Sequence, residues 1–189
     1  PHGAPTVTLK GADLTKAVLD NVRLIGADFE NCNLTDASFE GADLAECRFT
    51  SATLHSTRLR SAQLRSADFC GASLRDVTFE SAVLVAATFE GAVVLQRLNF
   101  TRANLATANL RMTDLRSCIF GARQRAGAAN LSNADLTSAT LVGCELRDVI
   151  FEGANLNGAN LFEADVTNAK FRGAHLIDTI GLTRTRAEE

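Results

Sequence analysis

A period of five organises the hydrophobic and polar positions along almost the whole chain. The quintets 11–15 (Gly-Ala-Asp-Leu-Thr), 26–30 (Gly-Ala-Asp-Phe-Glu) and 153–157 (Gly-Ala-Asn-Leu-Asn) each place a small residue, then Asp or Asn, before Leu or Phe. We call this Leu or Phe position the centre of a quintet. Centres recur at every fifth residue from Leu9 to Val94, from Phe100 to Phe120 and from Leu131 to Leu176. The 33 centres are 21 Leu, 10 Phe and 2 Val, namely Val94 and Val166.

A period of five fits neither the 3.6 residues of a helical turn nor the two residues of a continuous strand. In a short extended segment, residues two apart point to the same side, so the small residue and the centre can face inward together. The other three residues of each quintet then face water. The simplest path that returns each segment onto the one below is a coil with four short sides, which predicts a second period of twenty.

The Phe residues follow this second period. Phe29, Phe49, Phe69 and Phe89 recur at intervals of twenty, as do Phe39 and Phe79 one half-turn away. If each irregular step adds one residue, and if the second step also loses a centre near Ala126, Phe100 and Phe120 join the column of Phe39. Phe151 and Phe171 then join the column of Phe29, with Leu110 and Leu131 between. The sequence thus predicts that the ten core Phe lie on two opposite sides of the coil: Phe29, Phe49, Phe69, Phe89, Phe151, Phe171, Phe39, Phe79, Phe100 and Phe120.

The quintets resemble the A(D/N)LXX consensus of the pentapeptide repeat family over roughly residues 6–178. The resemblance implies an all-β fold, a right-handed quadrilateral parallel β-helix of about eight four-sided coils. We expect residues 1–5 to lead into this solenoid and residues 179–189 to form a tail. The Asp or Asn before each centre is expected to bond the local backbone at the turn.

Two interruptions, near 95–99 and at 121–130, are the places where the repeat breaks. The first is short and apolar, which favours a structural role. The second contains Arg123, Gln124 and Arg125. It is either a tolerated surface bulge or a partner-binding loop, because Arg is favoured where proteins bind protein partners or phosphates.

Charge changes along the chain, although the formal net charge is only −3. Residues 51–130 carry a net positive charge between two acidic ends, and Arg58, Arg60, Arg65 and Arg75 fall in two successive predicted coils. This run is either a solvated surface or a binding patch. Because no exposed aromatic residue accompanies these Arg residues, direct nucleic-acid binding is not expected, and the partner is expected to be a protein.

The sequence contains no recognisable catalytic or metal-binding motif, so we predict no enzyme activity, cofactor or metal. Cys32, Cys47, Cys118 and Cys144 occupy the inward small position, and the one-residue steps place each on a different side. No disulfide framework follows, which indicates a reducing, cytoplasmic compartment. No stretch is apolar and long enough to span a membrane.

These observations favour a non-catalytic, rigid protein–protein interaction domain of the adaptor, effector or scaffold type. The family resemblance implies an alternative, a bacterial protein that mimics DNA, binds a type II topoisomerase (DNA gyrase) and protects it from inhibitors. The positive middle of the chain speaks against this, because it would repel a DNA-binding surface. A homodimer through one end of the coil is a further expectation, to which the outward Phe162 could contribute.

Overall fold

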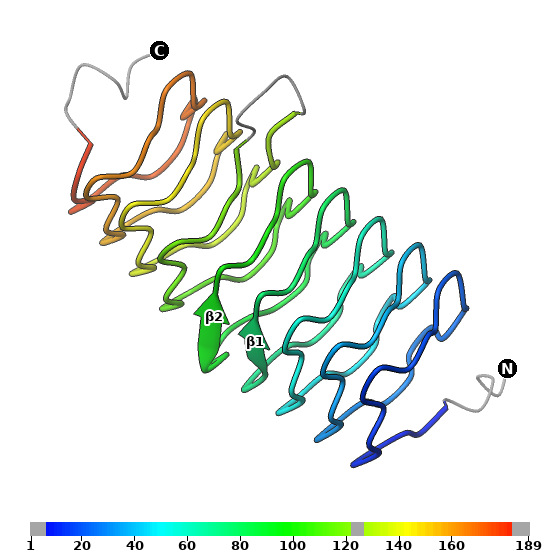
Figure 1. The fold of residues 1–189 in the computed structure, drawn as a ribbon. Coiled ribbons are helices and arrows are strands. Elements are labelled where there is room, and N and C mark those ends of the chain that lie inside the picture. Colours follow the sequence, from blue (N-terminus) through cyan, green and yellow to red (C-terminus); the bar gives the residue numbers. More distant parts are fainter. Residues whose placement is uncertain (1–6, 122–126, 183–189) are drawn as a thin grey trace, which may run out of the picture.

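The computed structural model describes residues 7–121 and 127–182 of the 189-residue chain. The chain winds into a stack of similar coils, with the first described coils (blue) and the last described coils (orange to red) at opposite ends of the stack (Figure 1). The strands β1 (Ser73–Arg75) and β2 (Val94–Gln96) pair in parallel. Elsewhere the coils are joined by isolated parallel bridges, mostly between residues twenty apart, such as Thr8 with Asp28. The described residues form no helix, and hence none that could cross a membrane.

A tight turn after each centre explains the period of five. The carbonyl oxygen of Phe29 accepts a hydrogen bond from the backbone N–H of Cys32 at 3.0 Å, and most described corners repeat this bond. The second residue after the centre has a positive φ, for example 59° at Asn31 and 68° at Gly26. A bond between residues three apart with a positive φ at the third position is the geometry of a type II turn. Each quintet is therefore one short extended side followed by one corner.

The bridges divide the centres among four sides of the coil, which we call faces 1 to 4 in chain order. Face 1 contains Leu9, Phe29, Phe49, Phe69, Phe89, Leu110, Leu136, Leu156 and Leu176. Face 2 contains Leu14, Leu34, Leu54, Leu74, Leu95, Leu115, Leu141 and Leu161. Face 3 contains Leu19, Phe39, Leu59, Phe79, Phe100, Phe120, Leu146 and Val166. Face 4 contains Leu24, Leu44, Leu64, Leu84, Leu105, Leu131, Phe151 and Phe171. The fold is a right-handed quadrilateral β-helix.

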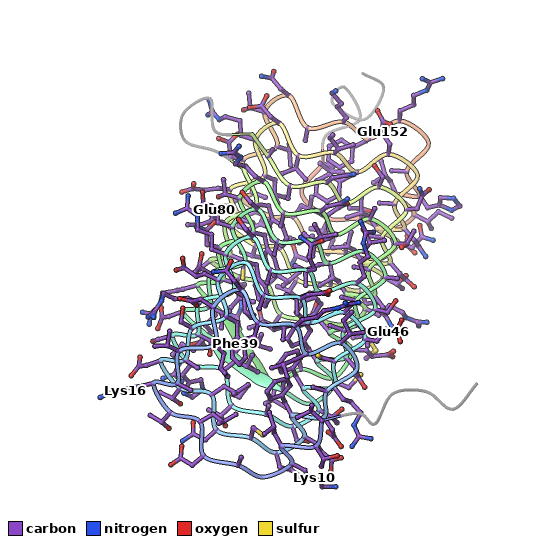
Figure 2. The ribbon with its side chains drawn as sticks, turned by 90° about the vertical axis from the view of Figure 1, so that its right-hand side faces the viewer. Lys10, Lys16, Phe39, Glu46, Glu80 and Glu152 are labelled. Atoms are coloured by element: carbon purple, nitrogen blue, oxygen red, sulfur yellow. The ribbon has the colours of Figure 1, made fainter. Side chains whose placement is uncertain are left out.

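The centres build one continuous core along the axis of the solenoid. Phe29, Phe49, Phe69 and Phe89 stack face to face, with ring centroids 4.8–5.0 Å apart. This spacing matches the ~4.8 Å between hydrogen-bonded strands. Rings of faces 1 and 3 meet edge to face across the axis, as Phe29 and Phe39 do at 5.7 Å. Figure 2 shows Phe39 inside the stack and Lys16, Glu46 and Glu80 at its surface.

The first interruption differs from the sequence-based assignment, which made Val94 a centre. The strand register pairs Ser73 with Val94 and Leu74 with Leu95, and Leu95 is buried. The extra residue therefore precedes Leu95, and the regular spacing resumes from Leu95 to Phe100. Two adjacent Val residues and a Leu leave the sequence ambiguous here, because each is apolar enough to serve as a centre.

The second interruption is a pure insertion, and the prediction of a lost centre near Ala126 is wrong. Phe120 lies on face 3 and Leu131 on face 4, the next face, as the bridges Ile119–Glu145 and Asn104–Asn130 require. The backbone N–H of Ala129 donates to the carbonyl oxygen of Phe120 at 2.8 Å and so closes the corner. An ordinary corner has two residues between such partners, and this one has eight. Six residues have been added to a single corner.

This insertion changes the face to which every later residue belongs. Phe151 and Phe171 stack on each other at 5.1 Å on face 4, rather than in the column of Phe29 as the sequence had predicted. Leu110 is followed on face 1 by Leu136, not by Leu131. The ten core Phe therefore occupy three faces. Spacing alone could not show this, because eleven residues can be divided between corners in more than one way.

Candidate protein-binding surface

The Asp or Asn before each centre serves the turn, as expected. Its side-chain oxygen accepts the backbone N–H two residues later, for example from Thr15 to Asp13 at 3.0 Å and from Cys70 to Asp68 at 2.9 Å. The same bond recurs at Asp28, Asn104, Asn109, Asp135 and Asn155. These side chains satisfy donors that the corner leaves open. Their regular occurrence is explained by the fold and requires no catalytic role.

The structure does not gather the predicted Arg patch on one surface. Arg58 and Arg60 flank Leu59 on face 3, Arg65 follows Leu64 on face 4, and Arg75 follows Leu74 on face 2. Neighbouring positions in the sequence become different sides of a four-sided solenoid. The net positive charge of residues 51–130 is therefore distributed around the molecule rather than concentrated.

Cross-coil ion pairs neutralise much of this positive charge. Arg60 lies 3.2 Å from Glu80 and Arg58 lies 3.6 Å from Glu40, nitrogen to oxygen. Arg97 donates two hydrogen bonds to Asp76 at 2.6 Å each, and these bonds lower the pKa of that carboxyl. Exposed pairs of this kind contribute little stability. These ion pairs nevertheless occupy the guanidinium groups that a strongly basic ligand site would need.

A hollow of about 410 Å³ lies on face 2 and is lined by Leu95, Gln96, Arg97, Asp114, Arg116 and Ser117. Arg116 lies 2.5 Å from Asp114, and this contact lowers the pKa of the Asp114 carboxyl. Arg97 is held by Asp76 in the same way. With both guanidinium groups paired to carboxylates, the hollow offers no free cation for an anionic ligand.

Four of the five thiols, those of Cys32, Cys47, Cys118 and Cys144, take the place of the inward small residue and face the hydrophobic core. The Sγ of Cys47 donates to the carbonyl oxygen of Leu24 at 2.9 Å, and that of Cys144 donates to Leu115 at 3.0 Å. Burial raises the pKa of Cys47, Cys118 and Cys144 to about 12, so these thiols are poor nucleophiles at neutral pH. The prediction that each lies on a different side is wrong, because the insertion places Cys144 next to Cys118 on face 3. All five cysteines are free.

The described residues contain no group of three or more His, Cys, Asp or Glu positioned to hold a metal ion. Within the same part of the chain, no buried side-chain nitrogen or oxygen lacks a hydrogen-bond partner.

The inserted corner is the longest interruption of the five-residue repeat. Arg123, Gln124 and Arg125, the candidate contacts taken from the sequence, lie outside the described residues. Before them, a Cβ at Gly121 would lie 2.7 Å from the carbonyl oxygen of Arg147, so only glycine fits against the coil above. After them, a Cβ at Gly127 would lie 3.3 Å from Cγ of Arg102. Gly121 and Gly127, which border the insertion, thus pack closely against the backbone or a side chain of a neighbouring coil.

One surface was missed by reasoning from the sequence. On face 4, the outward positions of the quintets 62–66, 82–86, 103–107 and 129–133 carry a single charged residue, Arg65. We call these positions the neutral patch. It could have been found only by placing residues 129–133 on face 4, which depends on treating the second interruption as an insertion.

The C-terminal coil also exposes apolar side chains. Phe162 is 55% exposed, Ile177 is 68% exposed and Ile180 is 55% exposed. Phe162 follows Leu161 on face 2, and Ile180 lies on the same face, where it pairs with Asn160 of the coil before. Ile177 follows Leu176 on face 1.

Family models match the chain on both sides of the insertion. A model described as a pentapeptide repeat region matches residues 12–90, and one described as pentapeptide repeats (8 copies) matches 92–121, 129–168 and 141–178. The chain belongs to the pentapeptide repeat family. These matches leave out residues 122–128, in agreement with a pure insertion between Gly121 and Ala129. A comparison with curated proteins gives no match.

Two solved forms of QnrB1 share this fold. A trypsin-treated form of QnrB1, a plasmid-mediated fluoroquinolone resistance protein, is 20% identical at a TM-score of 0.62, with 96% of this chain and 92% of that chain covered. Full-length QnrB1 is 21% identical at a TM-score of 0.53, with 96% and 94% covered. HetL, from the cyanobacterium Nostoc sp. Strain PCC 7120, is 25% identical over 93% of this chain and 92% of its own, at a TM-score of 0.35.

Proposed function

We propose that this pentapeptide repeat protein is a non-catalytic, rigid rod that binds a protein partner through its outward residues. The observation that carries the proposal is that each quintet has separate inward and outward positions. Two residues build a continuous core, and the remaining three are free to vary at the surface on a repeating backbone. Solenoids present extended surfaces of this kind, and nearest-neighbour packing keeps them rigid.

The inserted corner is part of this proposal. Six residues added to one corner leave the coils above and below in register, so the rod does not need them. Arg123 and Arg125 within the insertion are suited to pairing with carboxylates, and Gln124 adds a hydrogen-bonding amide. The five free thiols support a reducing, cytoplasmic location.

A pull-down with the purified chain and with the double variant Arg123→Glu, Arg125→Glu tests the role of the insertion. We expect recovery of the partner to fall at least about tenfold, which corresponds to a loss of about 1.4 kcal/mol in binding free energy. A double variant on the neighbouring coil, Arg147→Glu with Asp165→Arg, reverses an exposed ion pair and serves as the control. Equal recovery by the native chain and the insertion variant would exclude the insertion from the interface.

Protection of a type II topoisomerase is the second candidate. The family resemblance and the fold shared with QnrB1, a fluoroquinolone resistance protein, favour it. A supercoiling assay with purified DNA gyrase and a fluoroquinolone tests this function directly. Restored supercoiling in the presence of the chain would support protection, whereas unchanged inhibition at micromolar excess of the chain would exclude it.

A further inference from the structure

We propose that the neutral patch of face 4 is the docking surface for the partner, and that the partner presents carboxylates along the two edges of this face. This inference rests on the proposed protein-binding function and specifies which side of the rod carries it. The partner is a protein with an uncharged contact surface and an acidic border.

The first argument is the depletion of charge. The twelve outward positions of the neutral patch include one charged residue, Arg65. The corresponding middle quintets of face 2 carry five charged residues, namely Arg75, Asp76, Arg97, Asp114 and Arg116. Loss of charge at the centre is the compositional mark of a protein–protein interface. An ordinary solvated surface gains nothing from losing charge on one side alone.

The second argument is that several polar groups of the patch already have partners. Asn104 Oδ1 accepts the backbone N–H of Ala106 at 3.1 Å. Asn130 Oδ1 accepts both the backbone N–H and the hydroxyl of Ser132, at 3.0 and 2.7 Å. The hydroxyl of Thr107 donates to the carbonyl oxygen of Ala106 at 2.6 Å. Covering these groups therefore leaves few unsatisfied donors or acceptors, so the desolvation penalty is small.

The third argument concerns shape and apolar character. Val83 and Val85 point outward beside Ala86, and Asn104 and Ala106 stand in the next coil. All are short, and Val83 and Val85 are only partly exposed. Small side chains on a β-sheet surface have little rotamer entropy to lose when a partner covers them.

The charge at the border identifies the partner's chemistry. Among the described residues, Arg65, Arg75, Arg102 and Arg172 have no ion-pair partner, unlike Arg58, Arg60 and Arg97, and of these four only Arg65 and Arg102 lie in or beside the patch. Arg65 lies in the corner that leads from Leu64 toward face 1, whereas Arg102 lies in the corner that leads into Ala103 on face 4, against Gly127 of the insertion. Two free guanidinium groups beside a neutral surface match carboxylates on a protein. A nucleic acid would require a row of cations and exposed aromatic rings, which the patch does not contain.

Site-specific photo-crosslinking tests the proposal in the full chain. Benzoylphenylalanine is placed at position 85 in the patch, and in separate variants at positions 142, 50 and 60 on faces 2, 1 and 3. Cells of the source organism are irradiated and each adduct is identified by mass spectrometry. The protein captured at position 85 is then purified, and its Kd is measured against Val85→Glu, Arg65→Glu and the matched control Val142→Glu, which changes an outward valine at the equivalent quintet position on face 2.

We expect an adduct at position 85 that maps to an Asp- or Glu-containing segment of the partner. Val85→Glu and Arg65→Glu should each weaken binding at least tenfold, and Val142→Glu should change Kd by less than twofold. An adduct formed only at positions 142, 50 or 60 would overturn the patch while leaving the proposed function intact. A second copy of the chain, or a nucleic acid, captured at position 85 would overturn the proposal that the partner is an acidic protein. No adduct at any of the four positions, together with equal recovery of partner by the native chain and the Arg123→Glu, Arg125→Glu variant, would contradict the proposed function itself.

Discussion

At the residue scale, the fold depends on backbone conformations that most residues avoid. The second residue after each centre adopts a positive φ whether or not it is glycine, as at Lys16 (61°), Glu46 (59°) and Met112 (53°). A left-handed conformation costs a residue with a Cβ roughly 1–2 kcal/mol. At each corner, the turn hydrogen bond and the stacking of neighbouring coils hold the residue in this conformation.

Replacing Met112 with glycine should relieve part of this strain. Met112 is 74% exposed, so the side chain contributes little packing. Because glycine adopts positive φ freely but gains entropy in the unfolded chain, we expect Met112→Gly to raise the free energy of unfolding by about 0.5–1 kcal/mol. Urea denaturation measures the change, and Met112→Ala, which keeps a Cβ, should not reproduce it. Destabilisation by the glycine variant would contradict the assignment of this corner.

The buried thiols predict a loss of stability at alkaline pH. Burial raises the pKa of Cys47, Cys118 and Cys144 to about 12, whereas a thiol in the unfolded chain ionises near 8.5. The folded state is therefore fully favoured below about pH 8.5 and loses this advantage as the pH rises toward 12. Each thiol should remove up to about 1.4 kcal/mol per pH unit in this window.

Urea midpoints at about pH 8 and about pH 10 measure this loss, and the absence of Tyr removes one competing titration. Cys70 lies on the outward side of its quintet, and partial burial raises its pKa less strongly, so Cys70→Ser should reduce the slope by less than Cys47→Ala does. A stability that stays constant between these two pH values would contradict burial of the three thiols.

At the element scale, the unit of stability is one centre with its neighbours above and below. Phe69 is fully buried and stacks between Phe49 at 4.9 Å and Phe89 at 4.8 Å. Phe69→Ala should lower the free energy of unfolding by about 3–5 kcal/mol through lost burial and a residual cavity. Phe162→Ala, at an exposed Phe, should change it by less than about 0.5 kcal/mol. Similar effects from both variants would show that the Phe column is not the core.

The inserted corner offers a second test at this scale. Replacing residues 121–128 with Ser-Gly leaves two residues between Phe120 and Ala129, as at every ordinary corner. We expect the thermal midpoint to stay the same or rise, because a shorter corner costs less entropy to close. A variant that fails to fold would show that the insertion is part of the core structure.

The local structure could be predicted from the sequence, and the register through the interruptions could not. Regular spacing defined the inward positions, the corners and the stacking of Phe29 with Phe49. At Val94 the sequence offered two apolar candidates for one position, and hydrogen bonding selected Leu95. Between Phe120 and Leu131, an insertion of six residues and a replaced quintet with one addition have the same length. Because that choice fixes the face of every later residue, the sequence misplaced Phe151 and could not reveal the neutral patch.

At the scale of the whole molecule, one four-sided solenoid continues unbroken from Leu9 to Leu176. Each coil contacts only its neighbours, so the surface is an ordered array rather than a pocket enclosed by distant segments. Binding is expected to depend on which residues share a face. Sequence neighbours such as Arg60 and Arg65 lie on different sides, whereas Arg65 shares face 4 with Asn130.

The register across the insertion is the claim on which the face assignments depend, and disulfide formation tests it most directly. In a Cys70→Ser background, Arg111→Cys with Thr137→Cys places two thiols at equivalent outward positions of adjacent coils on face 1. This geometry lies within the Cα separations that a disulfide spans. Arg111→Cys with Ser132→Cys is the pair that a replaced quintet would have brought together. Mild oxidation should link positions 111 and 137 and leave 111 and 132 free, whereas efficient linkage of 111 with 132 would contradict the structure.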